Sequence, residues 1–199
     1  MNNRTLLAPA LVACALLQST AAGNAWSAGA DDSVVHEING CGLWPHTRCA
    51  GTDLRHADLA GRNLAGADLS GANLARADLR GANLAGANLD GADLRGARMN
   101  KVTAPGATFR NARLTGADLE AARLMRADFS GADLTAARLE AARANFAWFV
   151  DARLTSTDLQ EAKLYSANLR GANMEGSLIR FAIFSDVAFE GCTGCPTDW

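Results

Sequence analysis

Residues 67–96 read ADLSG ANLAR ADLRG ANLAG ANLDG ADLRG, a five-residue unit repeated without insertion or loss. The same phase runs from Leu54 to Phe189, where steps of five give 28 central positions. Eighteen of these are Leu, five Phe, two Met, one Ile and two Ala, and the residue two before the centre is Ala in 22 of the 28 units. A fixed short period determines the architecture of a chain, so it is interpreted first.

A period of five matches neither the 3.6 residues of a helical turn nor the alternation of a strand. It suits a coil in which each unit forms one side and then turns a corner. The central residue and the residue two before it are predicted to point inward, and the other three outward. Gly is common two after the centre, where a positive φ is favourable only without a Cβ.

These units resemble the pentapeptide-repeat family, whose pattern is A(D/N)LXX, and the resemblance covers 140 of the 199 residues. It implies an all-β fold, a right-handed quadrilateral β-helix with four pentapeptides per coil and capped ends. By that analogy the units make about seven coils, and stacking of roughly 4.8 Å per coil gives a rod of about 30 to 35 Å. Coils contact only their neighbours, so stability should be nearly one-dimensional.

Residues 1–30 have the features of a secretory signal peptide. Arg4 supplies the positive start, residues 6–17 the apolar run, and Ala28-Gly29-Ala30 a small-x-small cleavage site. The run is shorter than a transmembrane helix requires. The sequence therefore predicts a periplasmic or secreted bacterial protein. Residues 11–14 also resemble a lipobox, so a lipid anchor at Cys14 stays open as an alternative, although the apolar run continues past it.

The predicted organisation is a signal peptide at 1–30, an N-terminal cap at 31–51, the repeat at 52–191 and a C-terminal cap at 192–199. The four cysteines after residue 30 suggest disulfides in an exported chain. In the seven-coil geometry that the resemblance implies, the two ends are about 30 Å apart, whereas a disulfide needs Cα atoms within about 7 Å. We therefore predict Cys41–Cys49 and Cys192–Cys195. The same separation excludes a single four-cysteine zinc site.

Composition and motifs argue against catalysis and nucleic-acid binding. The net charge is −2, and removal of residues 1–30 takes away one Arg and no acid, which leaves −3. No strong basic or acidic field results.

His36, His46 and His56 are the only histidines. His46, near Cys49, could be a metal ligand, but a plain exposed loop histidine is favoured. The recurrent Asp residues follow from the period, and no phosphate-cradling glycine motif occurs. We expect no enzyme, cofactor, metal or nucleic-acid partner.

Two of the central positions, Ala104 and Ala144, lack a large side chain, and each is followed by a Phe at the next centre. Because protein interiors are close-packed, we interpret Phe109 and Phe149 as filling the vacated volume. Pro105 removes a backbone donor, so its coil is expected to be locally distorted.

Residues twenty apart stack in columns if four units form a coil. Two outward columns alternate in sign over part of their length, which predicts exposed ladders of ion pairs on solvated faces. Their members are Asp53, Asn73, Asp93, Arg113, Asp133, Arg153 and Asn173 in one column, and Asp58, Asp78, Arg98, Asp118, Arg138, Asp158 and Leu178 in the next.

A third outward column becomes basic in its carboxy-terminal half and lies beside outward aromatic residues. It runs Asn63, Asn83, Thr103, Arg123, Arg143, Lys163 and Ile183. Exposed aromatics beside Arg are typical of binding surfaces. The predicted partner-binding residues are Arg123, Arg126, Arg143, Phe146, Trp148, Lys163, Tyr165 and Phe181. A homodimer contact, or packing of the C-terminal cap over the aromatics, is the alternative interpretation.

Three functional hypotheses follow. The first is an exported, non-enzymatic structural or protein-binding solenoid scaffold whose partner is an unknown protein or envelope component. The second comes from the resemblance, since some members mimic B-DNA and bind DNA gyrase, protecting it from quinolones. The export signal, the near-neutral charge and the basic column weigh against it here. The third is a thiol-redox protein using Cys192 and Cys195, which no surrounding βαβ pattern supports.

Overall fold

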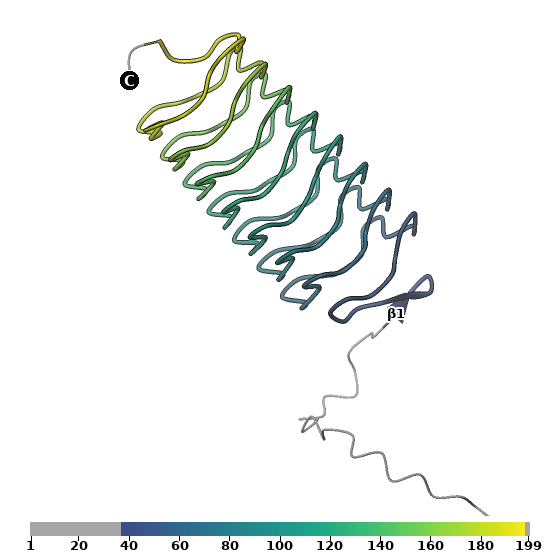
Figure 1. Ribbon diagram of the computed structural model, residues 1–199. Coiled ribbons are helices and arrows are strands. Elements are labelled where there is room, and N and C mark those ends of the chain that lie inside the picture. Colours follow the sequence, from purple (N-terminus) through teal and green to yellow (C-terminus); the bar gives the residue numbers. More distant parts are fainter. Residues whose placement is uncertain (1–36, 198–199) are drawn as a thin grey trace, which may run out of the picture. The chain divides into compact units, whose positions relative to one another are not determined.

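The computed structural model describes residues 37–197, so the predicted signal peptide lies outside the described residues. This part of the chain opens with an antiparallel hairpin of β1 (Glu37–Ile38) and β2 (Cys41–Gly42), in which Ile38 faces Cys41. The connecting residues Asn39 and Gly40 have φ values of 51° and 78°. Two consecutive positive φ values are typical of the two-residue turn that matches strand twist. The hairpin leads into the first coil (Figure 1).

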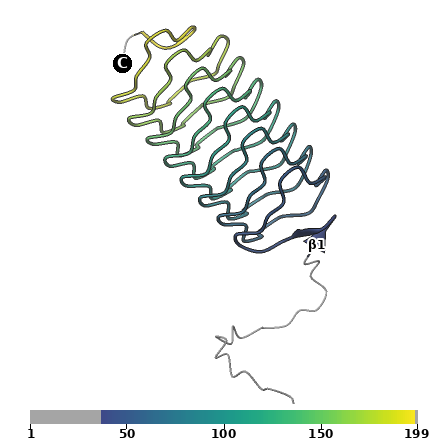
Figure 2. The ribbon, with the colours of Figure 1, turned by 45° about the vertical axis from the view of Figure 1, so that its right-hand side comes forward.

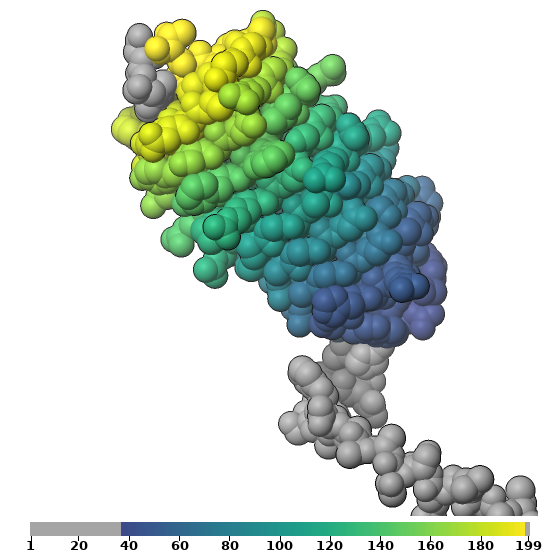
Figure 3. All heavy atoms as spheres, viewed as in Figure 1, coloured from purple at the N-terminus to yellow at the C-terminus, as the bar shows by residue number. Residues whose placement is uncertain are grey.

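From Arg48 to Thr193 the chain forms a parallel β solenoid. Isolated parallel bridges join residues twenty positions apart, from Arg48–Asp68 to Asn173–Thr193, so four units complete each coil. Each unit bonds in both directions: Asp78 N donates to Ala57 O at 2.9 Å, and Leu79 N donates to Arg98 O at 2.7 Å. Figures 1 and 2 show the coils stacked on one axis, and Figure 3 shows them as successive bands. No helix occurs among residues 37–197.

The interior of the solenoid consists of the two residue positions predicted to point inward. Leu74 and Ala72 are both fully buried, and the same holds for nearly every unit between residues 57 and 174. Burial of each Leu stabilises the fold by roughly 1.5–3 kcal/mol. The position two before the centre is not limited to Ala, since Val102 and Thr157 are fully buried there as well. The inward prediction is confirmed.

The corners lie two residues after each centre and have a positive φ throughout. Glycine occupies many of them, but His56 (φ 58°) and Phe146 (φ 59°) adopt the same conformation. A residue with a Cβ is destabilised there by roughly 1–2 kcal/mol. Glycine is therefore favoured at the corners but not required, and each bulky corner residue carries local strain.

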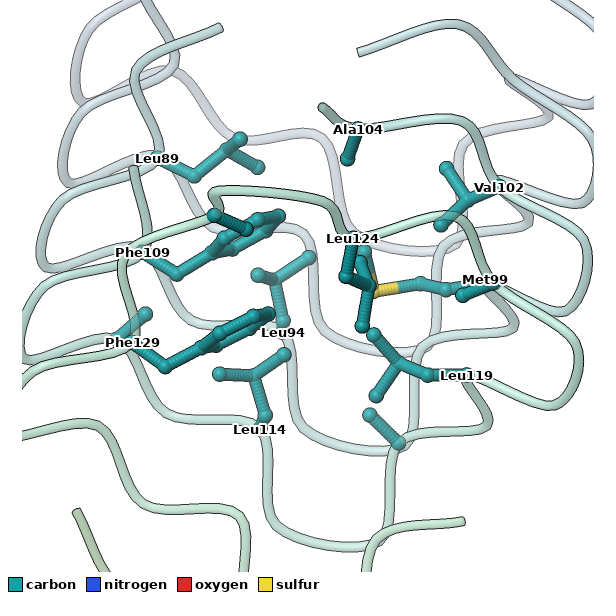
Figure 4. Close-up of a cluster of buried hydrophobic side chains, with 14 of the residues drawn as sticks. Leu89, Leu94, Met99, Val102, Ala104, Phe109, Leu114, Leu119, Leu124 and Phe129 are labelled. Atoms are coloured by element: carbon teal, nitrogen blue, oxygen red, sulfur yellow. The ribbon is translucent and has the colours of Figure 1, made fainter. Parts of the chain in front are cut away.

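Phenylalanines form a continuous stack inside the middle of the solenoid. The Phe129 ring lies 4.6 Å from that of Phe109 and 5.1 Å from that of Phe149, with interplanar angles of 4° in both pairs. Figure 4 shows Phe109 above Phe129, with Ala104 and Leu124 across the interior. The interpretation that Phe fills space left by Ala accounts for Phe109 and Phe149. It does not account for Phe129, which shares its coil with Leu124 and is stabilised by stacking on both sides.

The expected distortion at Pro105 is wrong. The neighbouring donors keep their bonds to the next coil, Ala104 N to Arg123 O at 2.8 Å and Gly106 N to Met125 O at 2.9 Å. In the preceding coil, the equivalent amide of Ala85 donates to the Asn83 side chain at 3.1 Å. The position after the centre therefore supplies no donor to the backbone ladder. Proline removes a donor that the coil does not need.

Two exceptions to the inward Ala make side-chain hydrogen bonds that the sequence did not reveal. Thr157 is fully buried and its Oγ1 donates to Leu134 O at 2.8 Å, and Ser177 Oγ donates to Leu154 O at 2.6 Å. Thr157→Val keeps the shape and removes the donor, so we expect the free energy of unfolding to fall by about 1 kcal/mol. Urea denaturation measures this. A variant as stable as the parent would show that the hydroxyl contributes nothing.

Both ends of the ladder carry a disulfide. Cys41–Cys49 has a Cα–Cα distance of 5.1 Å, and Cys192–Cys195 one of 5.9 Å. Cys49 occupies a buried central position, and its neighbour Arg48 already pairs with Asp68. Thr193 likewise pairs with the last full coil. Backbone pairing therefore extends beyond 52–191 in both directions, because it does not require the Leu and Ala side chains by which the repeat is recognised.

Candidate functional site

Two adjacent sides of the coil carry the candidate site, and each is defined by its bridged column. The third face carries Asn63, Asn83, Thr103, Arg123, Arg143, Lys163 and Ile183. The fourth face carries Arg48, Asp68, Asn88, Thr108, Asp128, Trp148, Asn168 and Ala188. The corner between them carries Met125, Arg126, Asn145, Phe146 and Tyr165.

Three cations stack on the third face without a counter-charge. Arg123 bridges to Arg143, and Arg143 to Lys163, on successive coils, and all three are exposed. None of the ion pairs formed within residues 37–197 includes them. Like charges directly opposite each other on neighbouring strands are destabilising. The arrangement therefore opposes folding slightly and favours an anionic ligand.

Several charged residues of the other faces form ion pairs, but in a different way from the predicted ladders. Arg80 Nη2 lies 2.6 Å from Asp78 Oδ2, two residues earlier in the same unit. Along the columns, Arg98 Nη1 is 3.3 Å from Asp78 Oδ2, and Arg113 Nη1 is 4.0 Å from Asp93 Oδ2. In an Asp-Leu-Arg sequence, the turn after the central Leu brings the Asp and Arg side chains together. The ladder prediction is thus right for two contacts in these columns, while the shorter Asp-Leu-Arg pairs lie within single units.

One exposed pair near the C-terminal end is expected to depend on pH. Arg170 Nε lies 2.8 Å from Glu190 Oε2, and its hydrogen bond lowers the pKa of Glu190 from 4.5 to about 2. The pKa of Glu190 is lower in the folded state than in the unfolded state, where it is near 4.5. The pair therefore contributes fully to the free energy of unfolding above pH 4.5, and this contribution is lost as the pH falls through about 2. Arg170→Gln should raise the pKa of Glu190 toward 4.5 in an NMR titration of its carboxyl. An unshifted midpoint would contradict the pairing.

Exposed aromatic side chains meet an unpaired Arg at the corner. Phe146 and Trp148 are 50% and 55% exposed, and the Arg126 guanidinium lies 5.9 Å from the centre of the Phe146 ring. Beside them on the fourth face is a hollow of about 380 Å³. This fourth-face hollow is lined by Thr108, Arg110, Arg126, Asp128, Phe146 and Trp148.

Asp128 forms the buried floor of the fourth-face hollow. Burial opposes its ionisation, but hydrogen bonds from Ser130 and Arg110 hold the pKa of Asp128 below its ordinary value. Ser130 Oγ donates to Asp128 Oδ1 at 2.6 Å, and Arg110 Nε donates to Oδ2. The Asp128 carboxylate and Arg110 therefore neutralise each other, and Arg126 is the cation left for a ligand.

A second hollow of about 190 Å³ lies on the third face, across the corner from the first. This third-face hollow is lined by Thr103, Pro105, Arg123, Met125 and Arg143. Met125 is 50% exposed and was not predicted as a site residue. A large apolar side chain in a slot that holds Ala65 and Ala85 in earlier coils was the signal that could have identified it.

The remaining predicted residues lie outside the two hollows. Lys163 lies on the third face, one coil after Arg143, and Tyr165 lies at the corner between the third and fourth faces on that same coil. Tyr165 is 36% exposed. Phe181 lies at the opposite corner of the third face, 66% exposed, with the Arg180 guanidinium 4.6 Å from its ring centre. Phe181 therefore lies apart from the two hollows. The described C-terminal residues leave all of these aromatics exposed.

Other candidate sites are weaker. A hollow of about 300 Å³ is lined by Arg55, His56, Ala75, Arg76 and Arg95, but Arg55 and Arg95 are each paired with an Asp two residues earlier. Among residues 37–197 no three His, Cys, Asp or Glu side chains are grouped to hold a metal ion. The same residues include no helix that could cross a membrane.

The comparison with known families identifies the class of protein. The sequence model of the family described as pentapeptide repeats matches this chain in eight copies, over residues 44–71, 63–100, 106–140, 137–176 and 157–193. These matches span most of the chain. The protein therefore belongs to the pentapeptide-repeat family, and the right-handed β-helix of that family agrees with the coils described above.

Among solved structures, one similar chain is HetL, a pentapeptide repeat protein involved in heterocyst differentiation regulation in the cyanobacterium Nostoc sp. strain PCC 7120. It is 32% identical, with 73% of this chain and 75% of that chain covered and a TM-score of 0.40. Another is a variant of QnrB1, a plasmid-mediated fluoroquinolone resistance protein, at 21% identity, 73% and 76% coverage and a TM-score of 0.46. A third is a pentapeptide repeat protein of the Arabidopsis thaliana thylakoid lumen, at 30% identity, 61% and 68% coverage and a TM-score of 0.33. No curated protein gave a match.

Proposed function

We propose that this protein is an exported, non-enzymatic scaffold that binds a protein partner through the corner between its third and fourth faces. The observation that carries the proposal is the unpaired stack of Arg123 and Arg143 beside the exposed Phe146 and Trp148. Aromatic residues and Arg dominate the energetics of protein interfaces. About seven capped coils would hold these side chains on a rigid surface.

The exposure of Phe146 at its corner supports the binding function. The same corner holds Gly66, Gly86 and Gly106 in earlier coils and Arg126 in the coil immediately before, all with a positive φ. Phe146 keeps that φ, at 59°, while half of its side chain is exposed. Solvent exposure of an aromatic ring disfavours folding and is typical of binding surfaces. The positive φ is shared by other non-glycine corners, so the exposure of the ring is what distinguishes Phe146.

The scaffold function is tested by capture of partners from a bacterial envelope extract on the immobilised protein, with bound proteins quantified by mass spectrometry. Arg143→Ala and Trp148→Ala are expected to weaken capture of a specific partner about tenfold each, as interface hot spots do. Phe146→Gly is the sharpest variant, because it relieves the corner strain. Its free energy of unfolding should stay within about 1 kcal/mol of the parent while capture falls.

Arg76→Ala is the matched control, because Arg76 is also an exposed, positive-φ corner residue but lies in the N-terminal half of the solenoid. It should leave capture unchanged. Equal capture by the parent, the site variants and the control would show that the corner is not the binding surface.

Export is part of the proposal and rests on the signal-peptide features of residues 1–30. Intact mass spectrometry of protein recovered from a fractionated bacterial host should give a periplasmic species. Its mass should match residues 31–199 less four hydrogens. A full-length, fully reduced cytoplasmic product would contradict export and favour the gyrase-binding alternative. A supercoiling assay with excess protein then tests that alternative directly.

A further inference from the structure

The two hollows at the corner lie on either side of a single ridge. Arg123 and Met125 line the third-face hollow, and Arg126, the next residue along, lines the fourth-face hollow. One coil further, Arg143 lines the third-face hollow and Phe146 lines the fourth-face hollow. A ligand that enters both hollows must therefore cross the ridge.

We propose that this corner binds a short acidic segment of a partner protein, which crosses the ridge and places an apolar side chain in each hollow. The inference rests on the proposed binding function and names the chemistry of the partner. Each hollow combines an apolar wall with an unpaired guanidinium: Met125 with Arg123 and Arg143, and Phe146 and Trp148 with Arg126. Guanidinium groups bind carboxylates in a bidentate geometry.

The surrounding acids do not satisfy these cations. Asp128, in the fourth-face hollow, is paired with Arg110. Glu120 and Glu140, before the third face, both lie against Arg138, whose Nη2 is 2.7 Å and 3.0 Å from their carboxylate oxygens. Arg123, Arg126 and Arg143 form none of the ion pairs within residues 37–197. Carboxylates supplied by a ligand would complete the pairing.

The geometry favours a chain-like ligand over an anionic membrane surface, although basic and aromatic residues also suit membranes. The two hollows lie on adjacent sides of a four-sided coil. A plane can lie against one of these sides, or touch the corner between them, but it cannot fill concave hollows on both. A flexible peptide can follow the corner and occupy both.

The test is a selection of octapeptides from a random display library on the immobilised full chain. We expect selected peptides to be enriched in Asp and Glu interspersed with apolar residues. A labelled selected peptide should bind at least tenfold more weakly to Arg143→Glu, and its affinity should fall with added salt. Met125→Ala and Trp148→Ala should weaken binding at least threefold each, because the proposal uses both hollows. Arg76→Glu changes the net charge equally and should have no effect.

Three results would overturn the inference. One is a selection that yields no peptides or peptides not enriched in acids. The second is binding that Arg143→Glu leaves unchanged. The third is co-sedimentation with vesicles of phosphatidylcholine and phosphatidylglycerol that depends on Arg143, which would assign the surface to membranes. If envelope capture still depends on Arg143 and Trp148 while acidic peptides are not selected, the scaffold function stands and only the acidic-segment inference fails.

Discussion

Phe129→Ala is expected to lower the free energy of unfolding by about 3–5 kcal/mol. Phe129 is fully buried and is the middle ring of the stack, 4.6 Å and 5.1 Å from its two neighbours. The substitution removes burial, leaves a cavity between fixed coils and breaks both ring contacts. Because each coil contacts only its neighbours, hydrogen exchange should increase most in the coils around residue 129. Urea denaturation and amide exchange measure the two effects.

Phe146→Ala is the matched control, since it removes the same atoms from a ring that is half exposed. It should change the free energy of unfolding by about 1 kcal/mol or less, because only an exposed contact with Arg126 is lost. Equal destabilisation by the two variants would mean that the phenylalanine stack does not hold the coils together.

Loss of the Cys41–Cys49 disulfide is the second large effect, about 2–3 kcal/mol from the chain entropy of a loop with a sequence separation of 8. Both half-cystines are 1% exposed, and the bond joins the β2 strand to the first coil. Cys41→Ala with Cys49→Ala should therefore destabilise the N-terminal end of the solenoid. Thermal unfolding and amide exchange of residues 37–51 would report it.

The double variant Cys192→Ala with Cys195→Ala is the comparison. Its disulfide closes a loop with a sequence separation of only 3 and lies among partly buried residues, so a smaller loss is expected. If both double variants unfold like the parent, the disulfides do not stabilise the ends of the solenoid.

The period predicted the inward residues, because their burial depends only on local units repeated in phase. The coil of four units, and with it the stacking of residues twenty apart, was predicted from the resemblance to the pentapeptide-repeat family. The period failed at Pro105 and did not explain Phe129. A proline was expected to break a hydrogen bond, but the ladder does not use that amide. Phe129 lacks a small partner in its coil and is held instead by rings of adjacent coils.

The candidate site was predicted in part. Arg123, Arg143 and Lys163 stack as the column count required, and Phe146 and Trp148 are exposed. Phe181, which was grouped with them, lies at the opposite corner of the third face and lines neither hollow. The contribution of Met125 and the neutral pairing of Arg110 with Asp128 were also missed.

The sequence by itself determined the solenoid, since one Leu and one Ala in every five residues can be buried together only if the chain coils in register. The tertiary structure alone decided which outward cations are paired and where the surface is hollow. Arg110 and Arg126 are both exposed arginines in the sequence pattern, but Arg110 reaches Asp128 in the next coil and Arg126 lies over Phe146. Outward side chains are not constrained by close packing, so their contacts depend on the corner geometry and on neighbours one coil away.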